Sequence, residues 1–490
     1  MKKILLILFG VLFVSGAYSA QIANVEYVHK MIEQTWDITV PYNRALNSVK
    51  QIANMKYLLS TIDVANHMLN GSATTDYGNG EFATTQVADT DTVNTAVETL
   101  VTDNGGRNYK FFITTISNTT SFKFYISAAG EFYVDWGDGT RNKITRTNTQ
   151  ELEYSHNYST AGTYTIKIGG KATAYNTASN TPAIGFSRII YTHYAYNIAS
   201  IDGSLGAIFG TLADGSQPRF YETFSGAYNM TGSIPANLFT GISGAPASYM
   251  FYETFFDCRG LTGAIPDGLF AGISGAPASS MFSGTFHGCR GLTSIPSDLF
   301  AGISGAPASF MFRGTFSGCS GLTGAIPDGL FGNLTGAPAD SMFGGTFQGC
   351  SHLTGAIPDG LFGNLSGAPA SSMFSRTFYA CSGLTGAIPD GLFAGISGKP
   401  ASSMFYGTFS GCSGLTSIPE NLFGNISGTA QDYMFRQTFY NCTSLTGPSA
   451  RINGQYLYEI WPDATFNQVD DMYYRATKLD DYANIPSAWK

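Results

Sequence analysis

Charged side chains are scarce in this sequence, and no stretch of it is basic. Asp, Glu, Lys and Arg make up 12% of the 490 residues, whereas aromatic residues reach 14%. Disordered chains have the opposite composition, so we expect a folded protein. The net charge is −8, and an acidic chain without basic clusters is a poor match for nucleic acid or anionic lipid as partners.

Long apolar runs are also lacking, apart from one at the amino terminus. Two lysines at positions 2 and 3 precede an apolar stretch from Ile4 to Val14, and small residues follow up to Ala20. This order is typical of an export signal, and the apolar stretch is too short to span a bilayer. We expect cleavage between residues 17 and 20. The mature chain would not insert into a membrane and would be secreted or displayed at the cell surface, with the periplasm as an alternative.

The constellations of residues that carry catalysis are not visible either. No GxSxG elbow, Walker-type loop or dinucleotide fingerprint opens a βα unit. The histidines are scattered, with no HExxH pattern and no His–Cys cluster of metal-ligand spacing. We therefore expect no enzyme activity, no cofactor and no metal site. An enzyme that acts on extracellular polymers is kept as a less favoured class.

Cysteine occurs only at regular intervals. The seven residues are Cys258, Cys289, Cys319, Cys350, Cys381, Cys412 and Cys442. Successive positions are 30 or 31 apart, which indicates a repeat rather than a disulfide framework. Stacked repeats would bring neighbouring cysteines within reach of a disulfide. Because their number is odd and stacked side chains point the same way, we favour buried, reduced thiols that pack as small apolar residues.

One repeat unit runs from Ser402 to Ser427, with the sequence SSMFYGTFSGCSGLTSIPENLFGNIS. Eight copies align, the first with Ala227 in place of cysteine, and a poorer ninth copy begins at Ile198. Units of 31 residues contain LTGAIP and units of 30 contain LTSIP. The difference is one glycine in an expected strand, where a bulge can absorb it.

Each unit combines two periodicities. Met404, Phe405, Thr408, Phe409 and Cys412 have the offsets of one face of a helix. The segment Leu-Thr-Ser-Ile that follows reads as a short β-strand. No unit can bury these side chains alone, so stacking must build one continuous core. The pattern predicts an α+β repeat solenoid with units of 30–31 residues.

The repeat pattern TFxGCxGLTxIPxxLFxxI, found over residues 198–447, resembles the BspA-like class of leucine-rich repeats. The units here are longer, because they contain the insertion SGAPASSMF, and they lack one isoleucine of the strand. The resemblance implies a bacterial-type surface protein that functions in adhesion or protein binding. We expect residues 448–490, which lose the pattern, to form a C-terminal cap.

A second motif lies upstream of the repeats. The segments FYVDWGDGT at 132–140, YSHNY at 154–158 and GTYTIKI at 162–168 resemble a PKD-type β-sandwich. Alternation of Tyr164, Ile166 and Ile168 independently predicts a half-buried strand. Asp135 and Asp138 could bind Ca²⁺, but we prefer a turn-forming role for both, and we interpret His156 as a packing residue.

These readings divide the chain into six parts. Residues 1–20 are the expected signal peptide, and 21–105 are expected to be a helical N-terminal segment with a polar connector. A PKD-like sandwich over 106–172 and a linker over 173–197 precede the solenoid at 198–447 and the cap at 448–490.

Variation between units is concentrated on the predicted outward face of the helix. Tyr, Arg and Phe recur there, and these types are enriched in binding interfaces. The candidate ligand-binding residues are Tyr252, Phe256, Arg259, His287, Arg290, Arg313, Arg376, Tyr379, Tyr406, Arg436 and Tyr440. The alternative is that they are tolerated surface residues.

The favoured function is therefore that of an adhesin, which binds an extracellular protein or glycan through an extended repeat surface. A structural spacer or surface-layer element without a ligand is the alternative. A constant threonine column, which includes Thr293, Thr323 and Thr354, is expected to face outward. It keeps open a docking strip for a repetitive ligand and, as a weaker match, ice binding. The sequence leaves the oligomeric state open.

Overall fold

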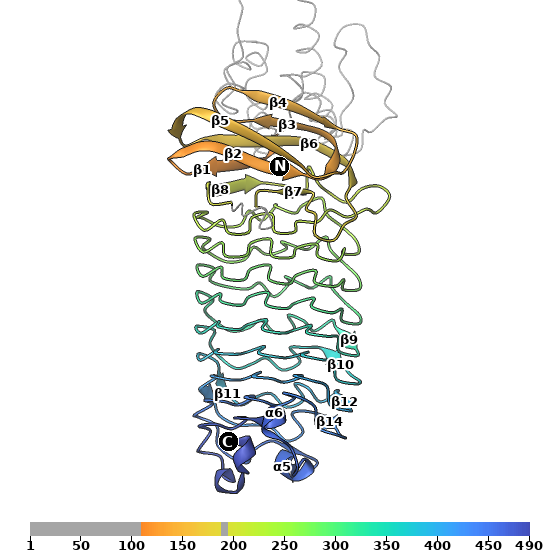
Figure 1. Cartoon of the computed structure of the whole chain (residues 1–490), viewed down its shortest axis with the longest axis vertical. Helices are drawn as coiled ribbons and strands as arrows, with labels where there is room; N and C mark the ends of the chain where they lie inside the picture. The colour runs from red at the N-terminus through yellow and green to blue at the C-terminus, as the bar shows by residue number, and fades with distance from the viewer. Residues whose placement is uncertain (1–108, 188–194) are drawn as a thin grey trace, which may run out of the picture. The chain divides into compact units, whose positions relative to one another are not determined.

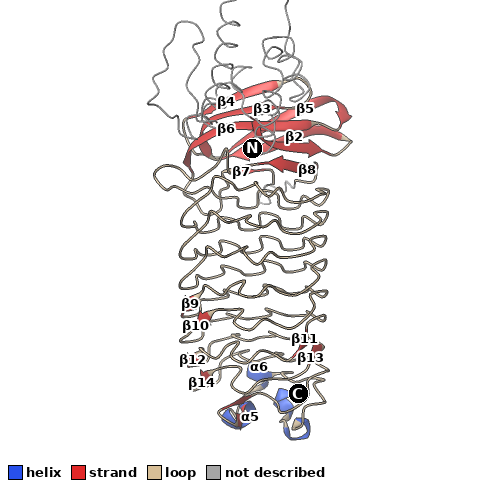
Figure 2. Cartoon of the chain, turned by 180° about the vertical axis from the view of Figure 1, so that it is seen from behind, coloured by secondary structure: helices blue, strands red, loops and turns tan. Residues whose placement is uncertain are grey.

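The computed structural model describes residues 109–187 and 195–490. The expected signal peptide and the expected helical segment 21–105 lie outside these ranges. Within them the chain is rich in β-structure and turns, and its few helices lie near the C-terminus (Figures 1 and 2). None of the helices in the described part has the length and hydropathy that a bilayer crossing requires.

Eight strands form two antiparallel sheets in the region where an all-β sandwich is predicted. The strands are β1 (Tyr109–Thr115), β2 (Thr119–Ile126), β3 (Ala128–Asp135), β4 (Arg141–Arg146), β5 (Leu152–Gly162), β6 (Thr165–Tyr175), β7 (Ile184–Gly185) and β8 (Ile198–Gly203). One sheet has the order β4-β3-β6-β1-β8, and the other has the order β5-β2-β7. In β6, Ile166 and Ile168 are buried, whereas Thr165 is exposed and Lys167 is half-buried. The expected alternation of buried and exposed side chains is therefore present.

The sheets extend past residue 172, where the sandwich was expected to end. Strand β7 pairs with β2, and β8 pairs with β1. The opposite edge of β8 accepts a hydrogen bond from the first repeat, from the Thr231 amide to the Ala199 carbonyl at 2.8 Å. Strand β7 likewise accepts from Thr223, whose hydroxyl lies 2.9 Å from the Ile184 carbonyl. The predicted linker 173–197 thus contains β7, which is hydrogen-bonded to the first repeat. Strand β8, at the start of the predicted solenoid, belongs to a sheet of the upstream domain.

The helix predicted in each repeat unit is wrong. Residues 402–411 and the equivalent residues of the other units form consecutive turns (Figure 2). Phe405 and Phe409 are buried as predicted, because a turn every four residues directs the same offsets inward as a helix does. We call this segment of each unit, from the residue before Met to Cys, the turn ladder.

Two kinds of backbone hydrogen bond alternate along the turn ladder. The Phe251 amide donates to the Met281 carbonyl of the next unit at 2.8 Å, whereas the Tyr252 amide donates to Tyr249 three residues back at 3.3 Å. Every fourth residue has a positive φ, as at Tyr249, Glu253 and Asp257, with values of 59°, 49° and 56°. In an α-helix the amides donate to carbonyl groups of the same helix, four residues back. Here half of them tie one unit to the next.

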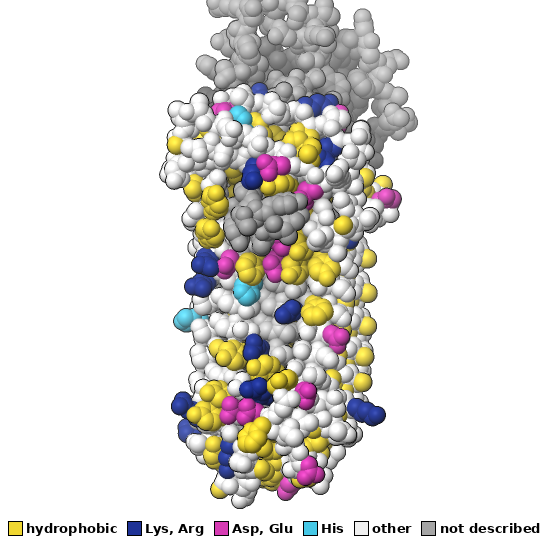
Figure 3. Space-filling view, in the orientation of Figure 1, with side chains coloured by type: hydrophobic (Ala, Val, Ile, Leu, Met, Phe, Trp, Pro, Cys, Tyr) yellow, Lys and Arg dark blue, Asp and Glu magenta, His cyan; other side chains and the backbone are white. Residues whose placement is uncertain are grey.

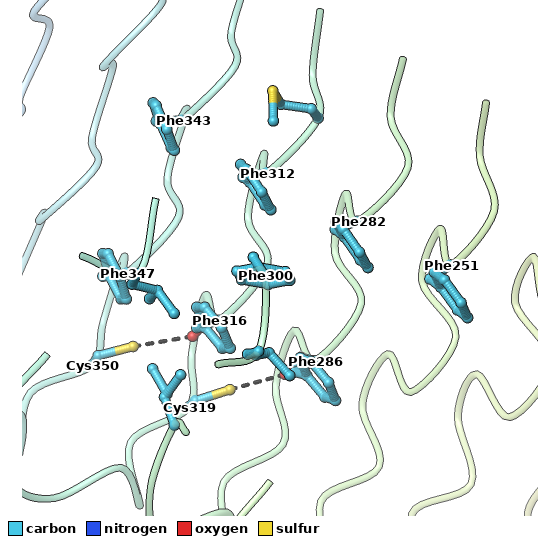
Figure 4. Packing of buried hydrophobic residues seen from close by; sticks show 14 of the residues in the cluster. Phe251, Phe282, Phe286, Phe300, Phe312, Phe316, Cys319, Phe343, Phe347 and Cys350 are labelled. Carbon is cyan, nitrogen blue, oxygen red and sulfur yellow. Dashed lines mark hydrogen bonds between the residues drawn. The ribbon is translucent and has the colours of Figure 1, made fainter. Parts of the chain in front are cut away.

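The core consists of columns of identical side chains that run through the units (Figure 4). Phe282 and Phe312 stack with ring centroids 5.6 Å apart and planes at 2°, and Phe286 and Phe316 do the same at 5.8 Å and 3°. Phe300, from the later part of its unit, tilts between the two columns at 4.6 Å from Phe312. Offset stacks of this kind add to the hydrophobic contribution of burial.

The other edges of each unit are held by short parallel pairings. The two-residue strands are β9 (Thr335–Gly336), β10 (Asn364–Leu365), β11 (Thr385–Gly386), β12 (Ser397–Gly398), β13 (Gly414–Leu415) and β14 (Asn425–Ile426). Elsewhere single bridges take their place, as between Gly263 and Leu292. Gly263, present only in units of 31 residues, has a φ of 81°, which accommodates the extra residue in the expected strand.

Large aromatic side chains cover the last unit. Tyr473 stacks on Phe439 at 5.7 Å, and Trp461 packs against Phe435 at 5.7 Å. Both rings are buried, as is Trp489. The elements of this region are β15 (Arg451–Ile452), β16 (Gln455–Tyr456), α5 (Leu457–Ile460), α6 (Phe466–Val469), η2 (Tyr482–Asn484) and η3 (Ser487–Trp489). The aromatic columns therefore end against protein and not against solvent.

Candidate binding surface on the turn ladder

All eleven predicted binding residues lie on the turn ladder or one residue beyond it. They divide by exposure. Exposed are Arg259, Arg290, Arg313, Arg376 and Tyr379, and half-buried are Tyr252, Phe256, His287, Tyr406, Arg436 and Tyr440. The half-buried ones lean on side chains of the neighbouring units, so the surface consists of contact clusters that cross from unit to unit. Figure 3 shows hydrophobic and charged side chains side by side on one face of the stack.

The first cluster, which we call the Glu253 cluster, contains Tyr221, Glu222, Tyr252 and Glu253. Tyr221 and Tyr252 stack with centroids 4.9 Å apart and planes at 7°. Glu222 and Glu253 occupy equivalent positions of adjacent units, both with positive φ. Burial, with a smaller effect of the neighbouring Glu222 carboxylate, raises the pKa of Glu253 to about 7. Two acidic groups are thus held close together in poorly hydrated surroundings.

Further along, Phe256 stacks on His287 of the next unit, with centroids 4.7 Å apart and planes at 11°. Burial lowers the pKa of His287, so its imidazole is neutral near pH 7 and acts here as a flat aromatic ring. Arg259 forms an ion pair with Asp257 at 2.8 Å, and Arg313 lies over the Phe310 ring at 5.7 Å. These pairs are separate contacts and do not converge on one point.

The second cluster, which we call the Arg376 cluster, contains Arg376, Tyr379 and Tyr406. The guanidinium of Arg376 lies 4.7 Å from the centre of the Tyr406 ring and 5.8 Å from that of Tyr379. Its Nη2 donates to the Tyr406 hydroxyl at 2.8 Å. Arg376 and Tyr379 belong to one unit and Tyr406 to the next, so this cluster also bridges two units.

A row of rings continues from the Arg376 cluster toward the C-terminus. Tyr406 lies 6.3 Å from Tyr433, and the guanidinium of Arg436 lies 5.4 Å from the Tyr433 ring. Arg436 also pairs with Asp470 at 3.2 Å. Tyr440 stacks on Tyr474 at 4.9 Å. Sequence reasoning missed Tyr221, Tyr433 and Tyr474. The first two occupy variable columns of the turn ladder, and Tyr474 lies in the C-terminal region 448–490.

The left-handed positions of the turn ladder differ between units. These positions lie two residues after the first Phe and two residues after the second Phe of a unit. Four units have glycine at both positions, and the others have a larger residue at one or both. The non-glycine residues at these positions are Glu222, Glu253, Asp257, Arg376, Ala380, Gln437 and Asn441. A side chain in this conformation costs on the order of 1 kcal/mol or more relative to glycine. Such residues are concentrated in the same units as the aromatic clusters.

The threonine column faces outward as predicted. Its members are Thr231, Thr262, Thr293, Thr323, Thr354, Thr385, Thr416 and Thr446, all exposed. Each threonine amide donates to a carbonyl of the preceding unit, as from Thr323 to Thr293 at 3.0 Å and from Thr354 to Gly324 at 2.8 Å. The column is therefore a regular strip of hydroxyl and methyl groups, without charge.

The WGDGT motif of the sandwich forms a closed network. Asp135 accepts a hydrogen bond from the Gly137 amide at 3.0 Å and pairs with Arg141 at 2.8 Å. Asp138 accepts from the Thr140 hydroxyl at 2.6 Å and pairs with His156 at 2.7 Å. The Thr140 hydroxyl, together with His156, lowers the pKa of Asp138 to about 2. Both carboxylates have the turn-forming role that we preferred for them.

His156 is part of the same network. Its ring stacks on Trp136 at 5.1 Å and meets the edge of Tyr158 at 4.8 Å.

Within residues 109–187 and 195–490, no three His, Cys, Asp or Glu side chains converge as metal ligands would. A cavity of about 390 Å³ beside Leu365, Phe374 and Phe393 is lined without titratable side chains.

Neither a protein-family model, nor a curated protein, nor a solved structure matches this chain.

Proposed function

We propose that this is a secreted or surface-displayed binding protein, an adhesin in character, whose repeats are a leucine-rich-repeat-like solenoid that follows a PKD-like sandwich. It would recognise an extracellular protein or glycan through the outward face of the turn ladder. The observation that carries the proposal is the contrast between columns. Inward columns hold Met, Phe, Thr, Phe and Cys in nearly every unit, whereas the outward positions change and gather Tyr, Arg and Phe.

Physical cost supports the same surface. A spacer needs only the inward columns, and glycine at the left-handed positions gives it the least strained turns. The units with Glu253 and with Arg376 depart from glycine at these positions, and strained backbone tends to cluster at functional sites. Tyr and Arg also dominate the energetics of known interfaces, because they combine apolar area with hydrogen bonding.

The experiment is a binding screen of the purified mature chain against arrays of extracellular matrix proteins and glycans, followed by two variants. One variant carries Tyr379→Ser, Tyr406→Ser and Arg436→Ser on the turn ladder. The other carries Thr293→Lys, Thr323→Lys and Thr354→Lys on the threonine column. We expect only the first to lose the ligand, with the unfolding midpoint of both measured as a control for folding.

Loss of binding in the threonine variant alone would move the site to the threonine column. Unchanged binding in both variants would show that neither surface of the repeats binds the ligand. A complete lack of ligands across the arrays would favour the structural spacer.

A further inference from the structure

We propose that the Arg376 cluster binds an acidic polysaccharide, a glycan chain that carries carboxylate or sulfate groups. This inference rests on the proposed function, since it requires that the outward face of the turn ladder is the binding surface. It adds the class of ligand and the residue that selects it.

The charge of Arg376 is available to a ligand. Arg259 and Arg436 are neutralised by Asp257 and Asp470, at 2.8 and 3.2 Å. The ion pairs formed among the described residues include none to Arg376, which is exposed. A guanidinium is the side-chain group best matched to carboxylate and sulfate oxygens, because its N–H groups form a planar fork.

The guanidinium of Arg376 is also held in place before any ligand arrives. The Tyr406 ring lies beneath it, the Tyr406 hydroxyl accepts from Nη2, and Tyr379 flanks it. Arginine side chains lose much rotamer freedom on binding, so prior fixation lowers the entropic cost of association. Gly407 of the next unit lies against both side chains, and an added Cβ atom there would make ordinary van der Waals contact with them. A Cβ atom there would lie 3.4 Å from the Arg376 Cγ and 3.6 Å from the Tyr379 ring.

The backbone of the turn ladder favours a glycan over an extended peptide. The amides of Arg376 and Phe378 donate to Tyr406 and Thr408 of the next unit, at 2.7 and 2.9 Å. The Tyr379 amide donates to the Arg376 carbonyl at 3.1 Å. A peptide that binds by strand addition needs an unpaired edge, and this segment has its amides engaged. Recognition must therefore go through side chains.

Those side chains match a linear sugar polymer. Tyr379 and Tyr433 are each 36% exposed, large values for tyrosines of a packed repeat. Tyr379 shares a unit with Arg376, Tyr406 lies in the next unit, and Tyr433 lies in the unit after that. Such rings offer rigid apolar area at low entropic cost, together with a hydroxyl group. The C–H face of a pyranose can lie on a ring while its carboxylate or sulfate reaches the arginine. Because the chain as a whole has a charge of −8, a polyanion gains little from non-specific attraction.

The test uses the mature protein coupled to a biosensor surface and four polymers at about 0.15 M salt, where long-range attraction is screened. Polygalacturonate carries carboxylates, dextran sulfate carries sulfates, dextran is the neutral counterpart, and polyglutamate is an acidic peptide. We expect binding of polygalacturonate, dextran sulfate or both, and no binding of dextran or polyglutamate. The carboxylate and sulfate arms identify which acidic group is recognised.

The structure offers a matched pair of variants. Arg376 and Ala380 lie in one unit with φ values of 56° and 58°, so Arg376→Gly and Ala380→Gly relieve comparable backbone strain. We expect Arg376→Gly to weaken acidic-polysaccharide binding at least tenfold and Ala380→Gly to leave it unchanged. The unfolding midpoints of both should equal or exceed that of the parent protein, which separates lost binding from lost folding.

Equal affinities of the two variants would overturn the proposal, and so would binding of polyglutamate as tight as that of the polysaccharides. If a protein or a neutral glycan binds through the turn ladder while the acidic polysaccharides do not, the inference fails and the proposed function stands. If no variant of the turn ladder alters any binding, both fail.

Discussion

The Sγ atom of Cys319 lies 2.9 Å from the carbonyl oxygen of Phe286 in the preceding unit and donates a hydrogen bond to it. Cys350 makes the same bond to Phe316 at 3.0 Å (Figure 4). The Thr315 hydroxyl does likewise one turn earlier, 3.0 Å from the Phe282 carbonyl. In the seven units that contain cysteine, threonine and cysteine thus perform one task, which is to supply a buried donor to the unit before.

We predict seven titratable thiols in the denatured, unreduced mature protein. All seven cysteines are free and buried, and burial raises the pKa of Cys319 and Cys350, which keeps the reactive thiolate scarce. The measurement is a thiol assay in denaturant without reductant. A value of one free thiol would mean three disulfides and would contradict the structure.

Replacement of Phe316 by alanine should destabilise the repeats by about 3–5 kcal/mol, as large core truncations do. Phe316 is completely buried between Phe286 and Phe347 in its column. Urea unfolding followed by circular dichroism measures the change. The exposed Thr323→Ala is the control, and a similar effect of both substitutions would place the Phe column outside the energetic core.

The stability of the Glu253 cluster should depend on pH. Because the folded state raises the pKa of Glu253 from 4.5 to about 7, ionisation favours the unfolded chain. Stability therefore falls as pH rises from about 4.5 to about 7 and is constant above, with a total change of roughly 2–4 kcal/mol. The groups that face Glu253 are Tyr252, Glu222 and Arg313. Urea midpoints across this pH range measure the effect.

The variant Glu253→Gln supplies the control for this pH dependence, since it keeps the shape of the side chain and cannot ionise. We expect a flatter stability profile between pH 4.5 and 7 than in the parent protein. Parallel profiles of the two proteins would show that other groups cause the dependence.

Two glycines with nearly the same conformation should respond differently to alanine. Gly424 and Gly329 have φ values of 66° and 64°. A Cβ atom at Gly424 would lie 2.1 Å from the Ile396 carbonyl oxygen, whereas at Gly329 it would meet nothing within 4 Å. Gly329→Ala should cost about 1–2 kcal/mol for the left-handed conformation, and Gly424→Ala clearly more. Equal unfolding midpoints would refute the close approach of the two units.

The repeat, its core columns and its outward positions could be predicted from the sequence, because each depends only on which residues recur. The local backbone could not. The offsets of Met404, Phe405, Thr408 and Phe409 fit both a helix and a turn every four residues, since 3.6 and 4 differ little over nine residues. The sequence signal against a helix was the pair Gly407 and Gly411, four residues apart inside the expected helix. In the structure both have positive φ.

The candidate surface shows the same division. The variable columns named eleven residues, but columns do not reveal which side chains touch. Arg376 reaches the Tyr406 ring from a left-handed position of the turn ladder. Sequence comparison between units could not supply this, since a positive φ at arginine is uncommon.

The bonds between units of the turn ladder also have a common direction. Amides of an earlier unit always donate to carbonyls of the later one, as from Phe312 to Met342 and from Phe343 to Met373. Peptide dipoles aligned in this way add up, as they do in a helix. The turn ladder then has a net dipole along the stack. Its carbonyl end lies near Glu222 and Glu253, and its amide end lies toward the C-terminus. We expect such a dipole to disfavour carboxylates at the first end and to favour anions toward the second.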